Sequence, residues 1–205
     1  MQSRRQRENR SNPSSPKSGA EGGSLRIIGG EWRGRRLNFP ALNGLRPTAD
    51  RVRETLFNWL APRIQGARCL DMFAGSGALG LEALSRGADH CDFLELQASA
   101  ANTIKQHLST LKAGGRGTVF GADALKFEGK GYDIVFVDPP FAEELSEAAL
   151  AHLLHSSLLA ADARIYLELG RSQSLPPLEP GFEILRDKTA GDVRYLLLAP
   201  VIDLD

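Results

Sequence analysis

The stretch that decides the fold is residues 67–87, ARCLDMFAGSGALGLEALSRG. An apolar run opens it, three glycines follow at Gly75, Gly77 and Gly80, and a helical pattern closes on Gly87. Glycines let the backbone approach a ligand closely, and the N-terminus of a helix offers free N–H groups to that ligand. A GxGxxG motif between a strand and a helix therefore predicts a nucleotide-type site, although it does not identify the ligand. A tight turn needed only for packing is the alternative reading.

Strand-like runs and helical patterns alternate from this stretch onward. We expect strands at 67–73, 90–96, 117–123, 132–138 and 163–169, and helices at 77–87, 99–113 and 143–159. Strands that alternate with helices form right-handed βαβ units and hence a parallel sheet. Residues 182–200 differ, because two strand-like runs flank KTAG with no helix between them. That pattern predicts a hairpin and an antiparallel last strand in an α/β fold.

The N-terminal third has a different character. Residues 1–24 are polar, basic and rich in Ser, Pro and Gly, which predicts a disordered tail. Residues 25–40 predict a small hairpin, and residues 45–60 predict a helix that starts near Pro47 and Thr48. Val52, Leu56, Trp59 and Leu60 share one face of that helix, which leaves the arginines on the other side.

The charge of the chain is zero in total but uneven along its length. Residues 1–53 hold 12 Lys and Arg against 4 Asp and Glu, a balance of +8, so the remainder carries −8. This asymmetry favours a nucleic-acid-binding arm on an acidic body, and a merely solvated basic tail is the alternative.

Several classes of protein are disfavoured by composition. No apolar run approaches the ~20 residues of a membrane helix, and the start of the chain lacks the apolar middle of a signal peptide. Cys69 and Cys91 each lie in an apolar run without a CxxC pair, which indicates two buried reduced thiols in a cytoplasmic protein. The four histidines show no ligand spacing, and we expect no metal.

Three acids follow predicted strands. They are Asp71, Glu95 and Asp123, and the carboxyl ends of parallel strands meet in the crevice where open α/β sheets bind ligands. Asp71 is placed for a cationic or amine-bearing ligand. Glu95 lies near the spacing expected of an acid that accepts ribose hydroxyls, with a plain surface acid as the alternative. Asp123 is a weaker signal, because Asp also caps helices.

A fourth strand ends in VFVDPPF, residues 135–141. Two prolines remove two N–H donors and restrict Asp138 to extended geometry. What remains is a rigid array of acceptors, the Asp138 carboxylate and nearby carbonyls, which suits an exocyclic NH₂ group. Phe141 offers a face on which a base can stack, worth ~1–3 kcal/mol. The corner therefore predicts a pocket for an amino-bearing base.

The order DMFAGSGALG, LEL, GADAL and VDPPF resembles the class I methyltransferases that use S-adenosylmethionine. With the flanking LRPTADRVRETLFNWL, LDMFAGSGALGLEALSRGA and IVFVDPPF, the chain is similar to the bacterial 16S rRNA (guanine(966)-N2)-methyltransferase family over about residues 25–200. The resemblance implies a Rossmann-like, seven-stranded sheet of order 3-2-1-4-5-7-6 with strand seven antiparallel. It also implies an Arg-rich RNA-binding extension at 25–64 and a methyltransferase domain at 65–205.

The same resemblance implies roles for individual residues. The cofactor S-adenosylmethionine would be bound by Asp71, Phe73, Gly75, Gly77, Glu95, Leu96, Asp123, Ala124 and Asp138. Asp138, Pro139 and Phe141 would form the catalytic corner, where the first two orient the guanine N2 amine and the third stacks on the base. RNA phosphates would be bound by Arg26, Arg33, Arg35, Arg36, Arg46, Arg51 and Arg53. Gln97 stands where many relatives carry an acid or another polar residue.

The implied substrate is 16S rRNA in an assembling 30S particle with its ribosomal proteins, and the implied enzyme is a cytoplasmic monomer with no membrane partner. Other readings stay open at this point. A NAD-dependent dehydrogenase fits the glycines and Glu95 but does not explain DPPF. Methylation of adenine N6 or of protein glutamine keeps the chemistry, although such relatives usually have Asn and Tyr in the tetrapeptide. A non-catalytic RNA-binding assembly factor is the third alternative.

Overall fold

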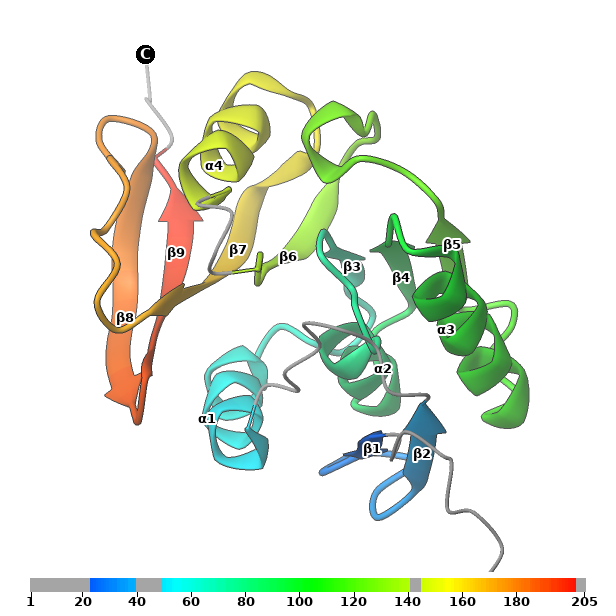
Figure 1. The fold of residues 1–205 in the computed structure, drawn as a ribbon. Helices are drawn as coiled ribbons and strands as arrows, with labels where there is room; N and C mark the ends of the chain where they lie inside the picture. Colours follow the sequence, from blue (N-terminus) through cyan, green and yellow to red (C-terminus); the bar gives the residue numbers. More distant parts are fainter. Residues whose placement is uncertain (1–22, 40–48, 141–144, 202–205) are drawn as a thin grey trace, which may run out of the picture.

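A seven-stranded sheet forms the centre of the protein (Figure 1). The computed structural model of the chain describes residues 23–39, 49–140 and 145–201. The strands of this sheet are β3 (Arg68–Asp71), β4 (His90–Leu94), β5 (Gly117–Phe120), β6 (Tyr132–Val137), β7 (Leu159–Gly170), β8 (Phe182–Ala190) and β9 (Val193–Pro200). The helices are α1 (Asp50–Leu60), α2 (Ala78–Ser85), α3 (Ala98–Thr110), the short 3₁₀ helix η1 (Ala124–Lys126) and α4 (Ser146–His155).

The strand order is β5-β4-β3-β6-β7-β9-β8. The first five of these strands pair in parallel, whereas β9 runs antiparallel to both β7 and β8. When β3 to β9 are numbered one to seven, this order is 3-2-1-4-5-7-6 with strand seven antiparallel. The predicted topology and the predicted terminal hairpin are therefore confirmed.

Alternate residues of each strand serve two different cores, as the two-residue period of a strand requires. Cys69, Phe93 and Phe136 face the core that α1, α2 and α3 cover. Leu70 and Val135, their neighbours in sequence, face the second core, which α4 and η1 cover. Figure 1 shows α1, α2 and α3 on one side of the sheet and α4 on the other. The result is a three-layer α/β/α arrangement.

The N-terminal segment forms a two-stranded sheet and a helix, as predicted. Strands β1 (Gly23–Arg26) and β2 (Arg36–Phe39) pair antiparallel. Gly23 and Ser24, which the sequence assigned to the tail, belong to β1, and residues 1–22 lie outside the described part of the chain. Helix α1 begins at Asp50, after Ala49 in a non-helical conformation, and the expected start at 47–48 lies outside the described residues.

This extension shares its hydrophobic core with α2 and α3. Leu25, Leu37 and Phe39 of the hairpin join the same buried cluster as Leu56 of α1 and Leu84 of α2. In Figure 1 the hairpin lies beside α2, at the edge of the molecule. The extension is therefore packed against the seven-stranded α/β fold and does not form a separate core.

One buried carboxylate on α2 binds the extension through hydrogen bonds and an ion pair. Glu82 is fully buried and accepts hydrogen bonds from the backbone N–H groups of Ile28 and Gly29, each at 2.8 Å. Its carboxylate also forms ion pairs with Arg53 at 3.5 Å and with Arg86 at 2.7 Å. The N-terminus of α2 carries the glycine loop, so the same helix joins the extension to the predicted cofactor site.

Both cysteines are buried and free, as predicted, and they lie opposite each other on β3 and β4. Burial raises the pKa of the Cys69 and Cys91 thiols. No helix within the described residues is both long and apolar enough to span a bilayer.

Candidate active site

The predicted acids gather at the carboxyl edge of four adjacent strands. Asp71 ends β3, Glu95 follows β4, Asp123 follows β5 and Asp138 follows β6. Because the sheet order is β5-β4-β3-β6, these positions line one continuous edge of the sheet. Open α/β sheets bind ligands at this edge, and the structure brings the four acids together there as expected.

The glycine loop makes the tight turn that the motif predicts. Gly75 and Gly77 have φ angles of 52° and 79°, a region that favours glycine, and Gly77 caps the start of α2. Gly80 is required for a different reason. A Cβ on it would approach the Phe93 ring to 2.2 Å, so only glycine lets α2 pack this closely on β4.

Asp71 binds the backbone at the start of α2, next to the glycine loop. Its carboxylate accepts a hydrogen bond from the Gly80 N–H at 3.0 Å. Asp71 is only 2% exposed, which is less than we expect of an acid that contacts a ligand directly. Burial raises the pKa of Asp71 to about 7; the Gly80 N–H opposes this shift, and the charges of Asp138 and Glu95 add to it. The charges of Asp138 and Glu95 therefore act on the buried Asp71 carboxyl group. Direct contact between Asp71 and a ligand stays a prediction.

Glu95 joins two loops of the site. One oxygen accepts the Gly75 N–H at 2.8 Å and the other accepts the Gln97 N–H at 2.7 Å. The side chain is half-buried, and each carboxylate oxygen has a second lone pair for a ligand hydroxyl. Leu96 beside it is 70% exposed, which is unusual for a leucine and leaves an apolar surface at the edge of the site.

Asp123 has the capping role that made it a weak signal in the sequence. Its carboxylate accepts the Leu125 N–H at 3.0 Å at the start of η1, and Lys126 lies 3.5 Å from its second oxygen. Ala124 is buried and Phe73 is half-buried. Their contact with adenine stays a prediction.

These features fit a cofactor made of an adenosine and an amino-acid part. The glycine loop offers close backbone approach, Glu95 offers acceptors for ribose hydroxyls, and Leu96 offers an exposed apolar face for a purine. S-adenosylmethionine carries all three of these chemical groups.

The DPPF corner lies next to the glycine loop. Asp138 is half-buried, Pro139 is buried and Pro140 is exposed, while Phe141 lies outside the described residues. β6 pairs directly with β3, with Asp71 opposite Phe136. Asp138 therefore lies one strand away from the loop and two residues further toward the edge of the sheet.

A further carboxylate at this corner is absent from the sequence-based prediction. Glu168 of β7 is 4% exposed and accepts a hydrogen bond from the Tyr166 hydroxyl at 2.6 Å. The signal was present in the sequence, because IYLELG places an acid among apolar strand residues just as LDMF and VFVDPP do. From the sequence alone, residues 163–169 are expected only as a strand.

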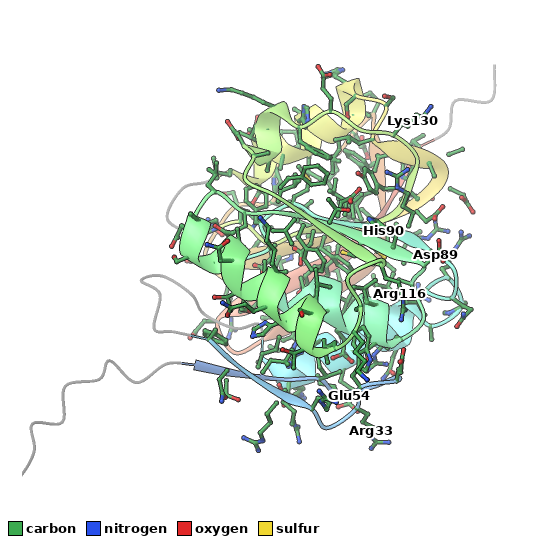
Figure 2. The ribbon with its side chains drawn as sticks, turned by 90° about the vertical axis from the view of Figure 1, so that its right-hand side faces the viewer. Arg33, Glu54, Asp89, His90, Arg116 and Lys130 are labelled. Carbon is green, nitrogen blue, oxygen red and sulfur yellow. The ribbon has the colours of Figure 1, made fainter. Side chains whose placement is uncertain are left out.

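The predicted RNA-binding arginines differ in exposure. Arg26, Arg33, Arg35, Arg36 and Arg51 are exposed, and Figure 2 shows Arg33 pointing away from the outer end of the hairpin. Arg26 also pairs with Asp50 at 2.7 Å. Arg46 lies outside the described residues.

The prediction that Arg53 binds RNA phosphates is corrected by its burial. Arg53 was expected on the open side of α1, but it is 1% exposed, pairs with Asp50 at 2.6 Å and donates to the Arg26 carbonyl at 2.8 Å. The buried stripe of α1 is wider than the sequence pattern suggested, because the buried Glu82 of α2 provides a counter-charge beneath it. A side chain held in this way is not available to RNA phosphates.

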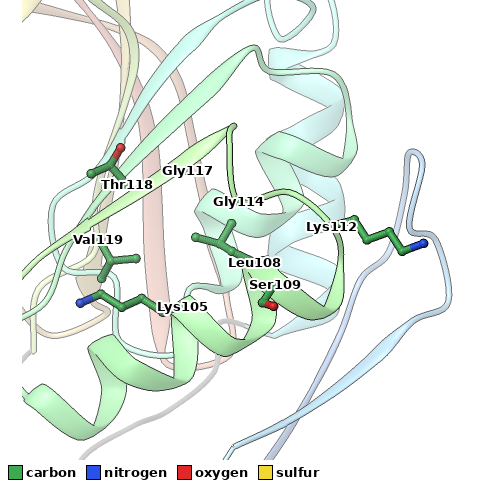
Figure 3. A pocket seen from close by; sticks show the side chains of 8 residues that line it. All are labelled: Lys105, Leu108, Ser109, Lys112, Gly114, Gly117, Thr118 and Val119. Carbon is green, nitrogen blue, oxygen red and sulfur yellow. The ribbon is translucent and has the colours of Figure 1, made fainter.

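A shallow hollow of about 600 Å³ lies elsewhere, between α3 and the edge strand β5 (Figure 3). Lys105 and Lys112 lie at its two ends, and Leu108 and Val119 are apolar side chains that line it. None of the predicted site residues line it, so it is separate from the carboxyl-edge site. Within the described residues, no three His, Cys, Asp or Glu side chains cluster as a metal site would require.

Comparison with known proteins agrees with this geometry. A family model described as "Conserved hypothetical protein 95" matches residues 25–199. "Ribosomal RNA small subunit methyltransferase D" of Escherichia coli (strain K12) is 49% identical over 178 residues, covering 85% of this chain and 89% of the relative. The protein of the same name from Haemophilus influenzae is 46% identical over 183 residues, covering 85% and 93%.

The fold has a close counterpart among solved structures. The structure of yhhF from Escherichia coli superimposes with a TM-score of 0.80 at 46% identity, covering 87% of this chain and 98% of that one. The family model and both relatives span the extension as well as the cofactor site. The chain therefore belongs to the family that this model describes, together with the ribosomal RNA small subunit methyltransferases D.

Proposed function

We propose that this protein uses S-adenosylmethionine to methylate the N2 amine of a guanine in 16S rRNA within the assembling 30S subunit. The observation that carries the proposal is the position of Asp138-Pro139-Pro140 at the end of β6, directly beside the glycine loop of β3. Family membership supports rRNA as the substrate, and the acceptor-only corner supports an amine as the target.

The residues of the glycine loop and the neighbouring strand ends would hold the cofactor. Gly75 and Gly77 would receive its amino-acid part, Glu95 its ribose, and Leu96 and Asp123 its adenine. When bound, S-adenosylmethionine supplies a methyl group on a positively charged sulfur.

Asp138 and the Pro139 carbonyl would act on the amine. The N2 lone pair of guanine is delocalised into the ring, so the amine is a weak nucleophile. Hydrogen bonds from the amine to these two acceptors would localise the lone pair and hold it in line with the methyl group. Well-oriented reactants gain about 7–11 kcal/mol from positioning alone.

Access to the amine requires the base to leave its paired context, as base-modifying enzymes generally require. Phe141 would then stack on the displaced base. The exposed arginines of the hairpin and α1 would hold the surrounding phosphates, so that RNA shape and the base pocket select the target. We propose that the enzyme acts as a cytoplasmic monomer.

The test is methyl transfer from tritiated S-adenosylmethionine to undermethylated 30S particles, naked 16S rRNA and DNA in parallel. Digestion to nucleosides should yield N2-methylguanosine from the particle. N6-methyladenosine would overturn the base assignment, and labelled protein would overturn the substrate. No transfer to any substrate despite cofactor binding would favour a non-catalytic role.

Asp138→Ala should lower methyl transfer by about 100-fold or more, because a misplaced amine loses much of the benefit of positioning. Cofactor binding, followed by calorimetry, should weaken far less than methyl transfer, because Asp138 is only one of the nine residues expected to bind the cofactor. Asp89→Asn changes an exposed acid far from this corner and is the matched control. A near-wild-type rate for Asp138→Ala would contradict the amine-orienting role.

A further inference from the structure

Glu168 lies beside Asp138 at the end of the neighbouring strand. β6 and β7 pair in parallel with Val137 opposite Leu167, so the next residues, Asp138 and Glu168, are adjacent across the two strands. Phe136 and Tyr166 share one core cluster with ring centroids 6.5 Å apart. Because strand residues alternate between faces, Asp138 and Glu168 share the face of these rings.

The Glu168 carboxylate is held in place. It is 4% exposed, it lies between Leu167 and Leu169, and the Tyr166 hydroxyl donates to one of its oxygens at 2.6 Å. Burial, with the charges of Glu168 and Asp138, raises the pKa of Tyr166, so this hydroxyl keeps its proton and remains a donor. Two carboxylates side by side at the ends of neighbouring strands present hydrogen-bond acceptors only, which suits a ligand edge rich in donors.

The Watson–Crick edge of guanine is such a ligand. Its N2 amine and its adjacent N1–H are donors in a row. Adenine presents an acceptor at N1 beside its amine, and that lone pair would face a carboxylate unfavourably. Two neighbouring acceptors can therefore distinguish guanine from adenine, whereas Asp138 alone recognises only an amine.

We propose that Glu168 is a specificity-determining residue that accepts the N1–H of the target guanine while Asp138 and Pro139 hold its N2 amine. This inference rests on the proposed function, because it takes guanine N2 as the reacting amine. Tyr166 acts as the positioning residue that holds the Glu168 carboxylate.

The experiment replaces the target guanine with 2-aminopurine, which keeps the N2 amine but has an acceptor at N1. Reconstituted 30S particles carrying either base would be compared by kcat/KM. Wild type should favour guanine by about 100-fold or more, as sites built around a hydrogen-bond donor reject analogues that lack it. Glu168→Gln should lower this preference at least tenfold, because an amide can donate to N1 of 2-aminopurine.

Controls separate this role from a structural one. Glu183→Gln, an exposed acid on β8, should leave the preference unchanged. Tyr166→Phe should reduce the preference while keeping the carboxylate, and it serves if Glu168→Gln does not fold. The rise in 2-aminopurine fluorescence on base displacement compares wild type and the variants on the 2-aminopurine particle by binding alone.

An unchanged preference in both the Glu168 and the Tyr166 variants would overturn the inference, even if both rates fell. Failure of the proposed function is recognised separately, because wild type would then give no N2-methylguanosine from the guanine particle.

Discussion

Three carboxylates share one face of the sheet at the active edge. Asp71, Asp138 and Glu168 come from the successive strands β3, β6 and β7. Burial disfavours the charged form of a carboxyl group, and neighbouring negative charges add to the effect. Burial is the main cause of the raised pKa of about 7 at Asp71, and the charges of Asp138 and Glu95 contribute to it. Asp71 is therefore partly protonated near pH 7 before any ligand binds.

The pH dependence of stability should report on Asp71. Its folded pKa of about 7 lies above the ordinary 3.8, so its contribution to stability is full below pH 3.8 and is lost as the pH rises through 7. The ligand-free wild type should therefore gain about 1 kcal/mol in free energy of unfolding between pH 8 and pH 6, relative to Asp71→Asn. Urea unfolding at both pH values measures this difference.

The control for this prediction is Asp89→Asn, because Asp89 is exposed and should show the same pH dependence as wild type. Equal pH dependence in wild type and Asp71→Asn would mean that Asp71 is already ionised well below pH 7.

At the scale of elements, α2 has two tasks. Its N-terminus carries the glycine loop, and its buried Glu82 holds the backbone of the β1–β2 segment and the Arg53 guanidinium. Ser85 of the same helix donates to the Gly29 carbonyl at 2.6 Å and accepts the Trp32 N–H at 2.9 Å. A substitution in α2 is therefore expected to affect both the glycine loop and the packing of the β1–β2 segment.

Glu82→Gln should destabilise the protein by about 3–5 kcal/mol, because Arg53 and Arg86 lose a buried counter-charge. Hydrogen exchange should quicken at the Ile28 and Gly29 amides and stay slow in β6 and β7. Glu54→Gln, on the exposed face of α1, is the matched control. Uniform acceleration across the sheet would show that the extension does not open separately.

Prediction from the sequence succeeded where a pattern was local. The glycine loop, the strand-end acids and the terminal hairpin each have a short signature, while the strand order came from the family resemblance. Arg53 was misplaced because its burial depends on Glu82, almost thirty residues away on another helix. Glu168 shows in the sequence as an acid within an apolar run, but its position beside Asp138 follows only from the register of β6 and β7, which the sequence of β7 does not show.

At the scale of the whole molecule, we expect the exposed arginines of the hairpin to set the salt dependence of RNA binding. Replacing Arg33, Arg35 and Arg36 together with alanine should weaken RNA binding. The slope of log K against log salt should fall in magnitude by about 2–3, because each lost phosphate contact accounts for about 0.7–0.9. Filter binding to 16S rRNA between about 50 and 200 mM salt measures the slope.

Arg63→Ala is the control for this variant, because Arg63 is paired with Asp162 at 2.5 Å. Its slope should match wild type. An unchanged slope in the triple variant would place the RNA on another surface.

The shared core of the extension and α2 has a consequence for exchanging segments between relatives. The extension packs its apolar side chains against α2, and two of its backbone N–H groups and Arg53 bind Glu82 of that helix, so we expect that it cannot be replaced on its own. A chimaera that takes residues 23–64 from a relative should fold only if α2 comes from the same parent. Substrate recognition and methyl-donor binding would then be inherited as one unit.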